Sequence, residues 1–268
     1  MRLKYFLEIF WSQAPLSWAI IRASECDLLS KQTFIAPILE VGCGDGLVTK
    51  TLFEGKKGYI DVGIDLDSNE LRRAKKTGMY QKLLKGDICH SAFATATFNT
   101  VFANGVLEHI PDLPLALAQI SRILKKNGRL ITTSPIDTYT NLLFYQRLFT
   151  FLQLPKLAEA YGNFINTKFA HRHLLSVKSW KKLFDQVGLE LITFQSCNNP
   201  RTTAVHDLFL PLSLGSKTYK DTSDRLALMP SIRKQLQKPL ISSLLALTNE
   251  ESNSGNINST VLLVAKKK

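Results

Sequence analysis

Residues 38–46 read Ile38-Leu39-Glu40-Val41-Gly42-Cys43-Gly44-Asp45-Gly46 and decide the fold. A short apolar strand that contains an acid runs directly into a turn with three glycines, where a missing Cβ lets a ligand approach the backbone. A dinucleotide-binding turn reads G-x-G-x-x-G and would need glycine at position 47, but that position is Leu47. The turn, together with Glu40, therefore points away from a pyrophosphate and towards a cationic nucleoside without phosphate.

Strands and helices alternate after this turn. Expected strands cover residues 35–41, 59–65, 83–87, 100–104 and 129–133, and expected helices cover 47–53, 68–76 (capped by Ser68) and 113–124. This alternation predicts an α/β fold with a mostly parallel, doubly wound sheet. Ligands of such sheets bind beyond the carboxyl ends of the strands, and Asp65, Asp87 and Asn104 lie at three of these ends.

The regular alternation stops after Pro135. Residues 136–170 form an insertion rich in leucine and aromatic residues, and a second insertion covers 195–258, with apolar residues at helical spacing (Ile232, Leu236, Leu240, Leu244 and Leu245). A helix is expected over 179–187, and strands over 189–194 and 260–265. The last two strands predict an antiparallel hairpin at the edge of a seven-stranded sheet.

The amino-terminal residues 3–30 predict two amphipathic helices separated by Pro15. We therefore expect an N-terminal helical cap over 1–34 and one large domain over 35–268 that carries both insertions. The basic, apolar start resembles a signal peptide, but Glu8 and Pro15 interrupt it and no cleavage site follows cleanly.

Composition bounds the class of protein. The formal net charge is +12, which indicates either a solvated basic surface or attraction to an anionic membrane, an acidic glycan or nucleic acid. Without an arginine–aromatic stripe, nucleic acid is disfavoured. Four scattered cysteines argue against structural zinc, and no apolar run reaches the length of a membrane span. We expect a cytoplasmic protein, with peripheral contact at the inner membrane face left open.

Four segments together resemble the class I S-adenosylmethionine-dependent methyltransferases, in the small-molecule, type 11-like group: 39–46, 63–67, 86–88 and 104–110. The resemblance covers roughly residues 35–135. It implies a Rossmann-like sheet, S-adenosyl-L-methionine as cofactor, no metal, and methyl transfer by in-line displacement to an O, N or C atom of a small or lipid-linked acceptor. The family positions that it implies for the cofactor are Glu40, Gly42, Cys43, Gly44, Gly46, Asp65, Leu66, Asp87, Ile88, Asn104, Gly105 and Leu107.

The resemblance also implies a role for each segment. The glycine turn would hold the methionine part, with Glu40 near its ammonium or a backbone donor. Asp65 would accept both ribose hydroxyls, and a carboxylate there also repels the 2′-phosphate of NADP. Asp87 would accept the adenine amino group while the backbone at Ile88 meets the ring. Residues 104–107 would line the wall next to the sulfonium.

Candidate general bases lie outside the matched region. His171 and His173 precede the helix expected over 179–187, and Tyr139 follows the fifth strand. The two histidines have a structural alternative, because one of the pair can instead cap or pack at the entry of that helix. Glu108 and His109 are expected to shape their loop rather than to act on substrate.

The acceptor is not encoded in a motif. Residues 136–170 are expected to form the acceptor lid. Its stretch 142–154 and the second insertion are unusually apolar. One explanation is that their helices pack over the core or form a homodimer. The other is that they bind an apolar acceptor or contact an anionic membrane. Two other activities remain as alternatives: an NAD-dependent Rossmann oxidoreductase and a non-catalytic S-adenosylmethionine-binding protein.

Overall fold

The computed structural model describes residues 2–54, 56–213, 235, 240–246 and 258–268, and the chain divides into two units. The sheet unit comprises Lys31–Asp137, Ala170–Gln195 and Val261–Lys268. The helical unit comprises Met1–Ser30, Thr138–Phe169 and Ser196–Thr260. Most residues of the expected N-terminal cap and of both insertions thus fall in the helical unit.

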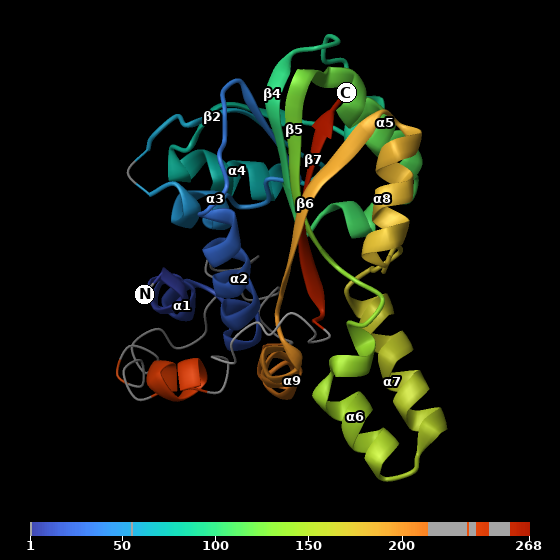
Figure 1. The fold of residues 1–268 in the computed structure, drawn as a ribbon. Coiled ribbons are helices and arrows are strands. Elements are labelled where there is room, and N and C mark those ends of the chain that lie inside the picture. The colour runs from blue at the N-terminus through green and yellow to red at the C-terminus, as the bar shows by residue number, and fades with distance from the viewer. Residues whose placement is uncertain (1, 55, 214–234, 236–239, 247–257) are drawn as a thin grey trace. The chain divides into compact units, whose positions relative to one another are not determined.

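Seven strands form one sheet in the order β3-β2-β1-β4-β5-β7-β6. Their bounds are β1 Ile38–Val41, β2 Ile60–Asp65, β3 Tyr80–Lys85, β4 Phe98–Asn104, β5 Leu124–Pro135, β6 Leu189–Cys197 and β7 Thr260–Lys267. The first five strands are parallel to one another, and β7 runs in the opposite direction between β5 and β6 (Figure 1). This confirms the predicted mostly parallel, seven-stranded sheet with an antiparallel hairpin at its edge.

Crossover helices connect the parallel strands. The sheet unit contains α3 Leu47–Leu52, α4 Ser68–Thr77, α5 Leu113–Ile123 and α8 Val177–Gln186, with short 3-10 turns η1 Ile88–His90 and η2 Leu107–His109. Leu39 and Val41 of β1 face one hydrophobic cluster, whereas Ile38 faces another with Ile60. Successive side chains of a strand point to opposite faces, so β1 is buried on both.

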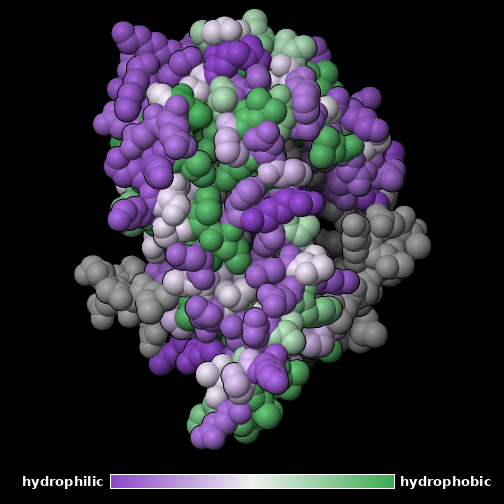
Figure 2. Space-filling view, turned by 90° about the vertical axis from the view of Figure 1, so that its right-hand side faces the viewer, coloured by the Kyte–Doolittle hydropathy of each residue, from purple (hydrophilic) through white to green (hydrophobic). Residues whose placement is uncertain are grey.

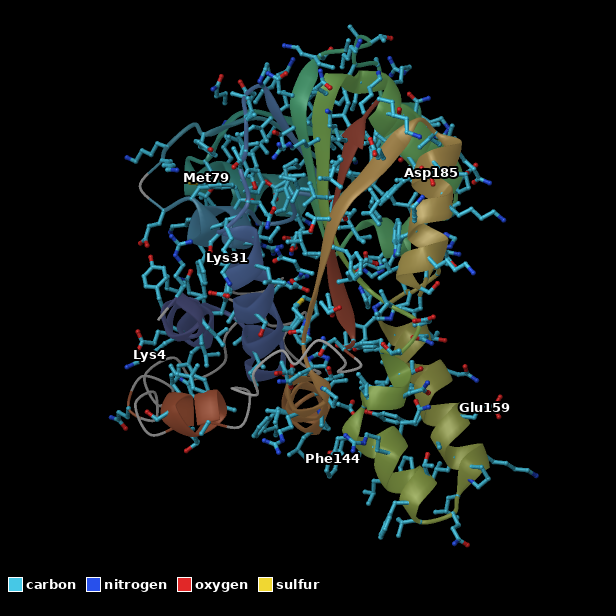
Figure 3. The ribbon with its side chains drawn as sticks, viewed as in Figure 1. Lys4, Lys31, Met79, Phe144, Glu159 and Asp185 are labelled. Carbon is cyan, nitrogen blue, oxygen red and sulfur yellow. The ribbon has the colours of Figure 1, made fainter. Side chains whose placement is uncertain are left out.

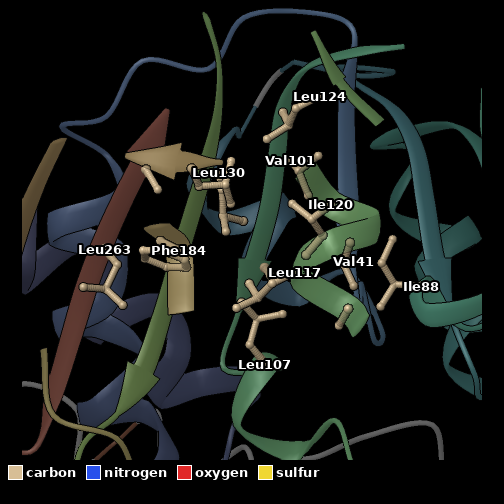
Figure 4. Close-up of a cluster of buried hydrophobic side chains, with 14 of the residues drawn as sticks. Val41, Ile88, Val101, Leu107, Leu117, Ile120, Leu124, Leu130, Phe184 and Leu263 are labelled. Atoms are coloured by element: carbon tan, nitrogen blue, oxygen red, sulfur yellow. The ribbon is translucent and has the colours of Figure 1, made fainter. Parts of the chain in front are cut away.

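The larger cluster fills the space between the sheet and α5. Val101 of β4 and Leu117 and Ile120 of α5 are fully buried there, together with Leu263 of β7 and Phe184 of α8 (Figure 4). Burial of side chains of this size contributes about 1.5–3 kcal/mol each. The central strands are therefore held firmly, and their carboxyl ends are fixed positions from which a site can be built.

Several predicted boundaries were wrong for local reasons. β1 begins at Ile38 rather than at residue 35, because Pro37 has no N–H to donate to a ladder. β3 begins at Tyr80, earlier than expected, since polar residues are tolerated on this terminal strand of the sheet. The cap of α4 is Asp67, whose carboxylate accepts from the N–H groups of Asn69 and Glu70, and not Ser68.

The predicted start of the fifth strand was also wrong. α5 ends at Ile123, one residue before the predicted end, and β5 already begins at Leu124 instead of at residue 129. The pairing with β4 shifts register between Phe98 and Thr100, so residues 125–128 bulge out of the ladder. Asn127 takes a positive φ of 64° in this bulge.

The helical unit contains α1 Arg2–Gln13, α2 Leu16–Leu29, α6 Phe144–Phe151, α7 Pro155–Lys168 and α9 Pro200–Leu208, with 3-10 turns η3 Thr140–Leu142 and η4 Pro211–Ser213. The two amino-terminal helices separated by Pro15 match the expectation. In the second insertion, residues 240–246 are helical, whereas Ile232 and Leu236 lie outside the described residues. Within the described ranges, no helix is long and apolar enough to cross a membrane.

Candidate functional site

The glycine turn leaves β1 in a conformation that only glycine adopts easily. Gly42, Gly44 and Gly46 have φ values of 65°, 52° and 74°. The N–H groups of Gly42 and Cys43 both donate to the carbonyl of Ile64, which ties the turn to β2. A Cβ on Gly42 would lie 2.5 Å from Val106, whereas one on Gly44 would have no atom within 4 Å. The turn is thus closed at Gly42 and open at Gly44.

Asp65 stands at the end of β2 beside this opening. Its Oδ2 accepts a hydrogen bond from the Gly44 N–H at 2.8 Å, and its Oδ1 accepts from the Asp67 N–H at 2.9 Å. The adjacent Leu66 is 67% exposed, unusually open for a leucine. The anchored carboxylate of Asp65 and the exposed side chain of Leu66 therefore follow each other in the chain, next to the open position at Gly44.

Glu40 lies beneath the turn and is buried. Thr49 Oγ1 donates to its carboxylate at 2.6–2.7 Å, and the Tyr80 hydroxyl donates at 2.9 Å. Burial raises the pKa of the Glu40 carboxyl to about 7, although the hydrogen bonds from Thr49 and Tyr80 act in the opposite direction. These two partners belong to α3 and β3, and they hold the turn from below.

Asp87 follows β3 and caps the short turn η1. Its Oδ1 accepts from the Cys89 N–H at 2.9 Å, and its Oδ2 lies 3.4 Å from His90 Nδ1. The side chain of Ile88 is buried in the main core, so only its backbone can contact a ligand. Cys43 is likewise buried, and burial raises the pKa of its thiol, which makes it a poor nucleophile.

The loop after β4 forms the next part of the edge. Asn104 Oδ1 accepts from Thr133 Oγ1 at 2.7 Å, and Gly105, with φ 63°, donates its N–H to the Thr133 carbonyl at 3.1 Å. Leu107 is fully buried among the residues of the main core, so its side chain points away from solvent. The loop is therefore fixed at its base by β5.

The histidine segment is pinned to the same loop. The N–H groups of Arg172 and His173 both donate to the carbonyl of Glu108, and His173 Nε2 lies 3.0 Å from the Ile110 carbonyl. The rings of His171 and His109 are stacked, with centroids 5.6 Å apart and planes 15° apart. A carbonyl can only accept, so His173 Nε2 is the donor there, and this contact anchors the segment. The structure thus brings His171, His173 and the β4 loop together.

Tyr139 belongs to the helical unit and is buried there. Its hydroxyl lies 3.3 Å from His206 Nε2, while His206 Nδ1 bonds the Ser17 carbonyl at 2.8 Å. Burial raises the pKa of Tyr139 and lowers the pKa of His206 to about 4. The neighbouring Asp207 accepts from the Tyr161 hydroxyl at 2.5 Å.

Two residues that support the turn were missed by sequence reasoning, because Thr49 and Tyr80 hold Glu40. Val106, within the segment 104–107 expected next to the sulfonium, packs against Gly42. Thr49 lies nine residues from Glu40, but Tyr80 lies forty residues away, and no local pattern marks such a contact. No group of three or more potential metal ligands occurs within the part of the chain that the structure describes.

Comparison with known proteins identifies the region that carries this site. A family model described as a methyltransferase domain matches residues 39–132, from β1 into β5. The chain is 37% identical over 114 residues to a malonyl-(acyl-carrier protein) O-methyltransferase of Legionella pneumophila, a match that covers 40% of each chain. A demethylmenaquinone methyltransferase of Lactiplantibacillus plantarum is 28% identical over 61% of this chain and 74% of its own. The chain spans about two-fifths of the length of the Legionella relative.

The fold agrees with that match. An S-adenosylmethionine-dependent methyltransferase from Thermotoga maritima superposes with a TM-score of 0.55 at 17% identity, covering 94% of this chain and 92% of that one. The likeness extends well beyond the matched domain. Residues 39–132, which include the strands that build the turn, therefore match a methyltransferase domain, and the chain shares the fold of a solved S-adenosylmethionine-dependent methyltransferase.

Proposed function

We propose that the chain transfers the methyl group of S-adenosylmethionine to an O, N or C atom of a small or lipid-linked acceptor. The observation that carries this proposal is the opening at Gly44, where an added Cβ would meet no atom within 4 Å. The Asp65 carboxylate borders this opening through its hydrogen bond to the Gly44 N–H. The backbone at Gly44 is therefore accessible next to the fixed Asp65 carboxylate, and this arrangement suits a nucleoside that lies against the turn.

The surrounding residues fit a cationic nucleoside without phosphate. Residues 42–46 contain an acid, Asp45, and no basic side chain that could neutralise a phosphate. Each Asp65 oxygen accepts one backbone hydrogen bond and has a second lone pair for a ribose hydroxyl. The exposed Leu66 offers an apolar surface for a base, and Asp87 is an acceptor after the next strand.

The hydrogen bonds of Glu40 argue for an indirect role in binding. Both of its oxygens are engaged by Thr49, and Tyr80 donates to one of them. A buried carboxyl that is held in this way supports the turn and places negative charge behind it. We therefore assign Glu40 to the shape and field of the cofactor pocket.

When bound, S-adenosylmethionine supplies an activated methyl group on a sulfonium whose leaving group is neutral. The residues of this chain then have to orient the acceptor and exclude water for an in-line displacement. We assign the removal of a proton from an acceptor hydroxyl or amine to His171, and the support for this is that its segment is held beside the loop that follows β4. His173 keeps this segment in place through Ile110 and is a weaker candidate base. Tyr139 stays a third candidate.

The relatives suggest which acceptors to test first. Their names give a malonyl group on acyl-carrier protein and a demethylmenaquinone as acceptors. A panel should therefore contain carrier-bound and free carboxylic acids, and quinols with and without an isoprenoid chain. Methyl groups would be followed from an isotope-labelled donor into each product.

Titration calorimetry tests the cofactor part of the proposal. S-adenosylhomocysteine should bind the full chain with a one-to-one stoichiometry, and NAD should give no heat of binding. Binding of NAD instead would support the oxidoreductase alternative. Binding of S-adenosylhomocysteine without labelled methyl transfer to any member of a broad panel would point to a non-catalytic binding protein.

A further inference from the structure

The turn between α6 and α7 carries an unusually apolar surface. Residues 151–157 are all exposed, and Phe151 is 82% exposed. We call Leu148, Phe151, Leu152, Leu154 and Leu157 the apolar tip; all five are large hydrophobic side chains that face solvent. Turns of globular proteins are normally polar, so a contiguous exposed group of this kind marks an interaction surface. In Figure 2, hydrophobic side chains gather at the lower end of the view, among hydrophilic ones.

The apolar tip is not what holds the two helices together. Ala158 and Ile165 form the buried face of α7. A Cβ on Gly162 would lie 2.6 Å from Gln146 Oε1, so α6 and α7 approach closely at that point. Tyr161 also packs edge-on against Tyr145 of α6, with ring centroids 5.5 Å apart. The hairpin thus has its own packed interface, and the residues of the tip remain outside it.

Local backbone structure directs the tip outward. Leu148, Phe151 and Leu152 are spaced i, i+3, i+4 and share one face of α6 at its end. Gln153 takes a positive φ of 59°, which turns the chain sharply before Leu154 and Pro155 begin α7. The hairpin of α6 and α7 therefore ends in a protruding apolar surface, which suits insertion into a fluid hydrocarbon layer better than binding of a small ligand.

The charges around the tip have one sign. Between Thr138 and Ala158 the only charged residues are Arg147 and Lys156, and both are exposed. Arg147 directly precedes the first residue of the tip, and Lys156 lies between its last two residues, Leu154 and Leu157. The first acid of the hairpin is Glu159 on α7, which Figure 3 labels together with Phe144 at the start of α6. A cationic border around an apolar end complements a layer of anionic headgroups over hydrocarbon.

We propose that the apolar tip inserts into the interface of an anionic lipid bilayer, with Arg147 and Lys156 at the level of the headgroups. A second copy of the chain fits less well. A two-fold contact through the tip would bring the Arg147 and Lys156 side chains of both copies together, and like charges there repel. The net charge of +12 favours approach to the same anionic surface. This inference stands on the hairpin alone and does not depend on the methyl-transfer proposal.

Co-sedimentation of the full chain with vesicles tests the proposal. Binding is expected to vesicles that contain phosphatidylglycerol and to fall steeply for vesicles of phosphatidylcholine alone or at high salt. The double variant Phe151→Ser with Leu154→Ser should reduce the partition coefficient by about tenfold or more. Leu212→Ser is the matched control, because Leu212 is 72% exposed in the same unit but outside the tip, and it should bind as the wild type does.

Two further variants separate the outcomes. Phe151→Trp should show a blue shift of tryptophan emission on addition of anionic vesicles, a readout that works even if the serine variant folds poorly. Replacing both Arg147 and Lys156 by glutamine should weaken binding and flatten its salt dependence. Wild-type protein that ignores anionic vesicles, or a serine variant that binds them equally well, would overturn the proposal. The proposal would also be overturned if the serine variant bound vesicles normally and differed from the wild type only by the loss of a dimer in sedimentation velocity.

Discussion

The Asp65 carboxylate accepts the backbone N–H of Gly44 at 2.8 Å, so the acid that ends β2 is fastened to the turn that ends β1. The two strands are parallel neighbours, with Val41 in register with Ile64. The position of the acid relative to the opening at Gly44 is therefore set by the sheet and not by a flexible loop. This preorganisation reduces the entropy that is lost when a ligand orders the site.

Replacing Asp65 by alanine should weaken S-adenosylhomocysteine binding. Hydrogen bonds to a charged group contribute about 1.5–3 kcal/mol, which corresponds to a loss of roughly tenfold to a hundredfold in affinity. Calorimetry measures the change. Asp67→Ala is the control, since Asp67 caps α4 and should cost about 1 kcal/mol of stability with little change in affinity. Equal effects of the two variants on affinity would contradict the assignment.

Alanine at Gly42 and at Gly44 should have different consequences. Both positions have a positive φ, which costs about 1–2 kcal/mol for a residue with a Cβ. Gly42→Ala also forces its Cβ to within 2.5 Å of Val106, so it should lower the free energy of unfolding more than Gly44→Ala does. Gly44→Ala should instead lose ligand affinity, because its Cβ occupies the opening. Denaturant unfolding and calorimetry on both variants check this pair.

The clash at Gly42 can be verified by a double-mutant cycle. Val106→Ala removes the two methyl groups that would lie 2.5 and 2.7 Å from a Cβ at position 42. It should therefore recover part of the stability that Gly42→Ala loses, although the strain from the positive φ remains. Strictly additive effects would mean that Val106 does not limit this position.

The strand-end residues could be predicted because each depends on local sequence. The apolar strand before Gly42, the acid after β2 and the asparagine after β4 are all visible within a few residues. Parallel strands then align their carboxyl ends without further information. The order of elements and the hairpin of β6 and β7 followed from the same reasoning.

The support of the site could not be predicted, because it depends on contacts between distant residues. Tyr80 reaches Glu40 from β3, and its role follows only from the register of β2 between β1 and β3. The bulge at Asn127 changes the length of β5 without a change in hydrophobic pattern. The contacts of His206 in the helical unit could not be predicted for the same reason. Its partners, Ser17 and Tyr139, lie in two other segments that are distant in the sequence.

Glu40 should make the stability of the protein fall as the pH rises. Its folded pKa of about 7 lies above its ordinary value of 4.5, so the folded state binds more protons between these values. The stabilisation by the protonated carboxyl is complete below pH 4.5 and is lost as the pH rises through 7. Relative to Glu40→Gln, the wild type should lose about 3 kcal/mol of unfolding free energy across this range. Parallel pH profiles of the two proteins would contradict the raised pKa.

His206 should produce the opposite slope. Burial lowers its pKa from 6.5 to about 4, so the unfolded state binds more protons between these values. Stability from the neutral ring is present above pH 6.5 and is lost as the pH falls through 4. A His206→Gln variant retains an amide that can bond the Ser17 carbonyl but does not titrate. Denaturant unfolding from pH 4 to 7 should show a difference between wild type and variant that shrinks steadily towards acid pH.

The two candidate bases should separate in kinetics once an acceptor is found. His171 is held beside the β4 loop with its ring stacked on His109, whereas His173 Nε2 is engaged with the Ile110 carbonyl. His171→Gln should lower kcat by about a hundredfold or more and remove the acidic limb of the pH–rate profile. His173→Gln keeps a side-chain donor for Ile110, so it should retain most of kcat and leave that limb in place. His173→Ala, which loses the anchor, should raise KM for the acceptor. Unchanged turnover of both His171→Ala and His173→Ala at saturating acceptor would show that neither histidine is the base.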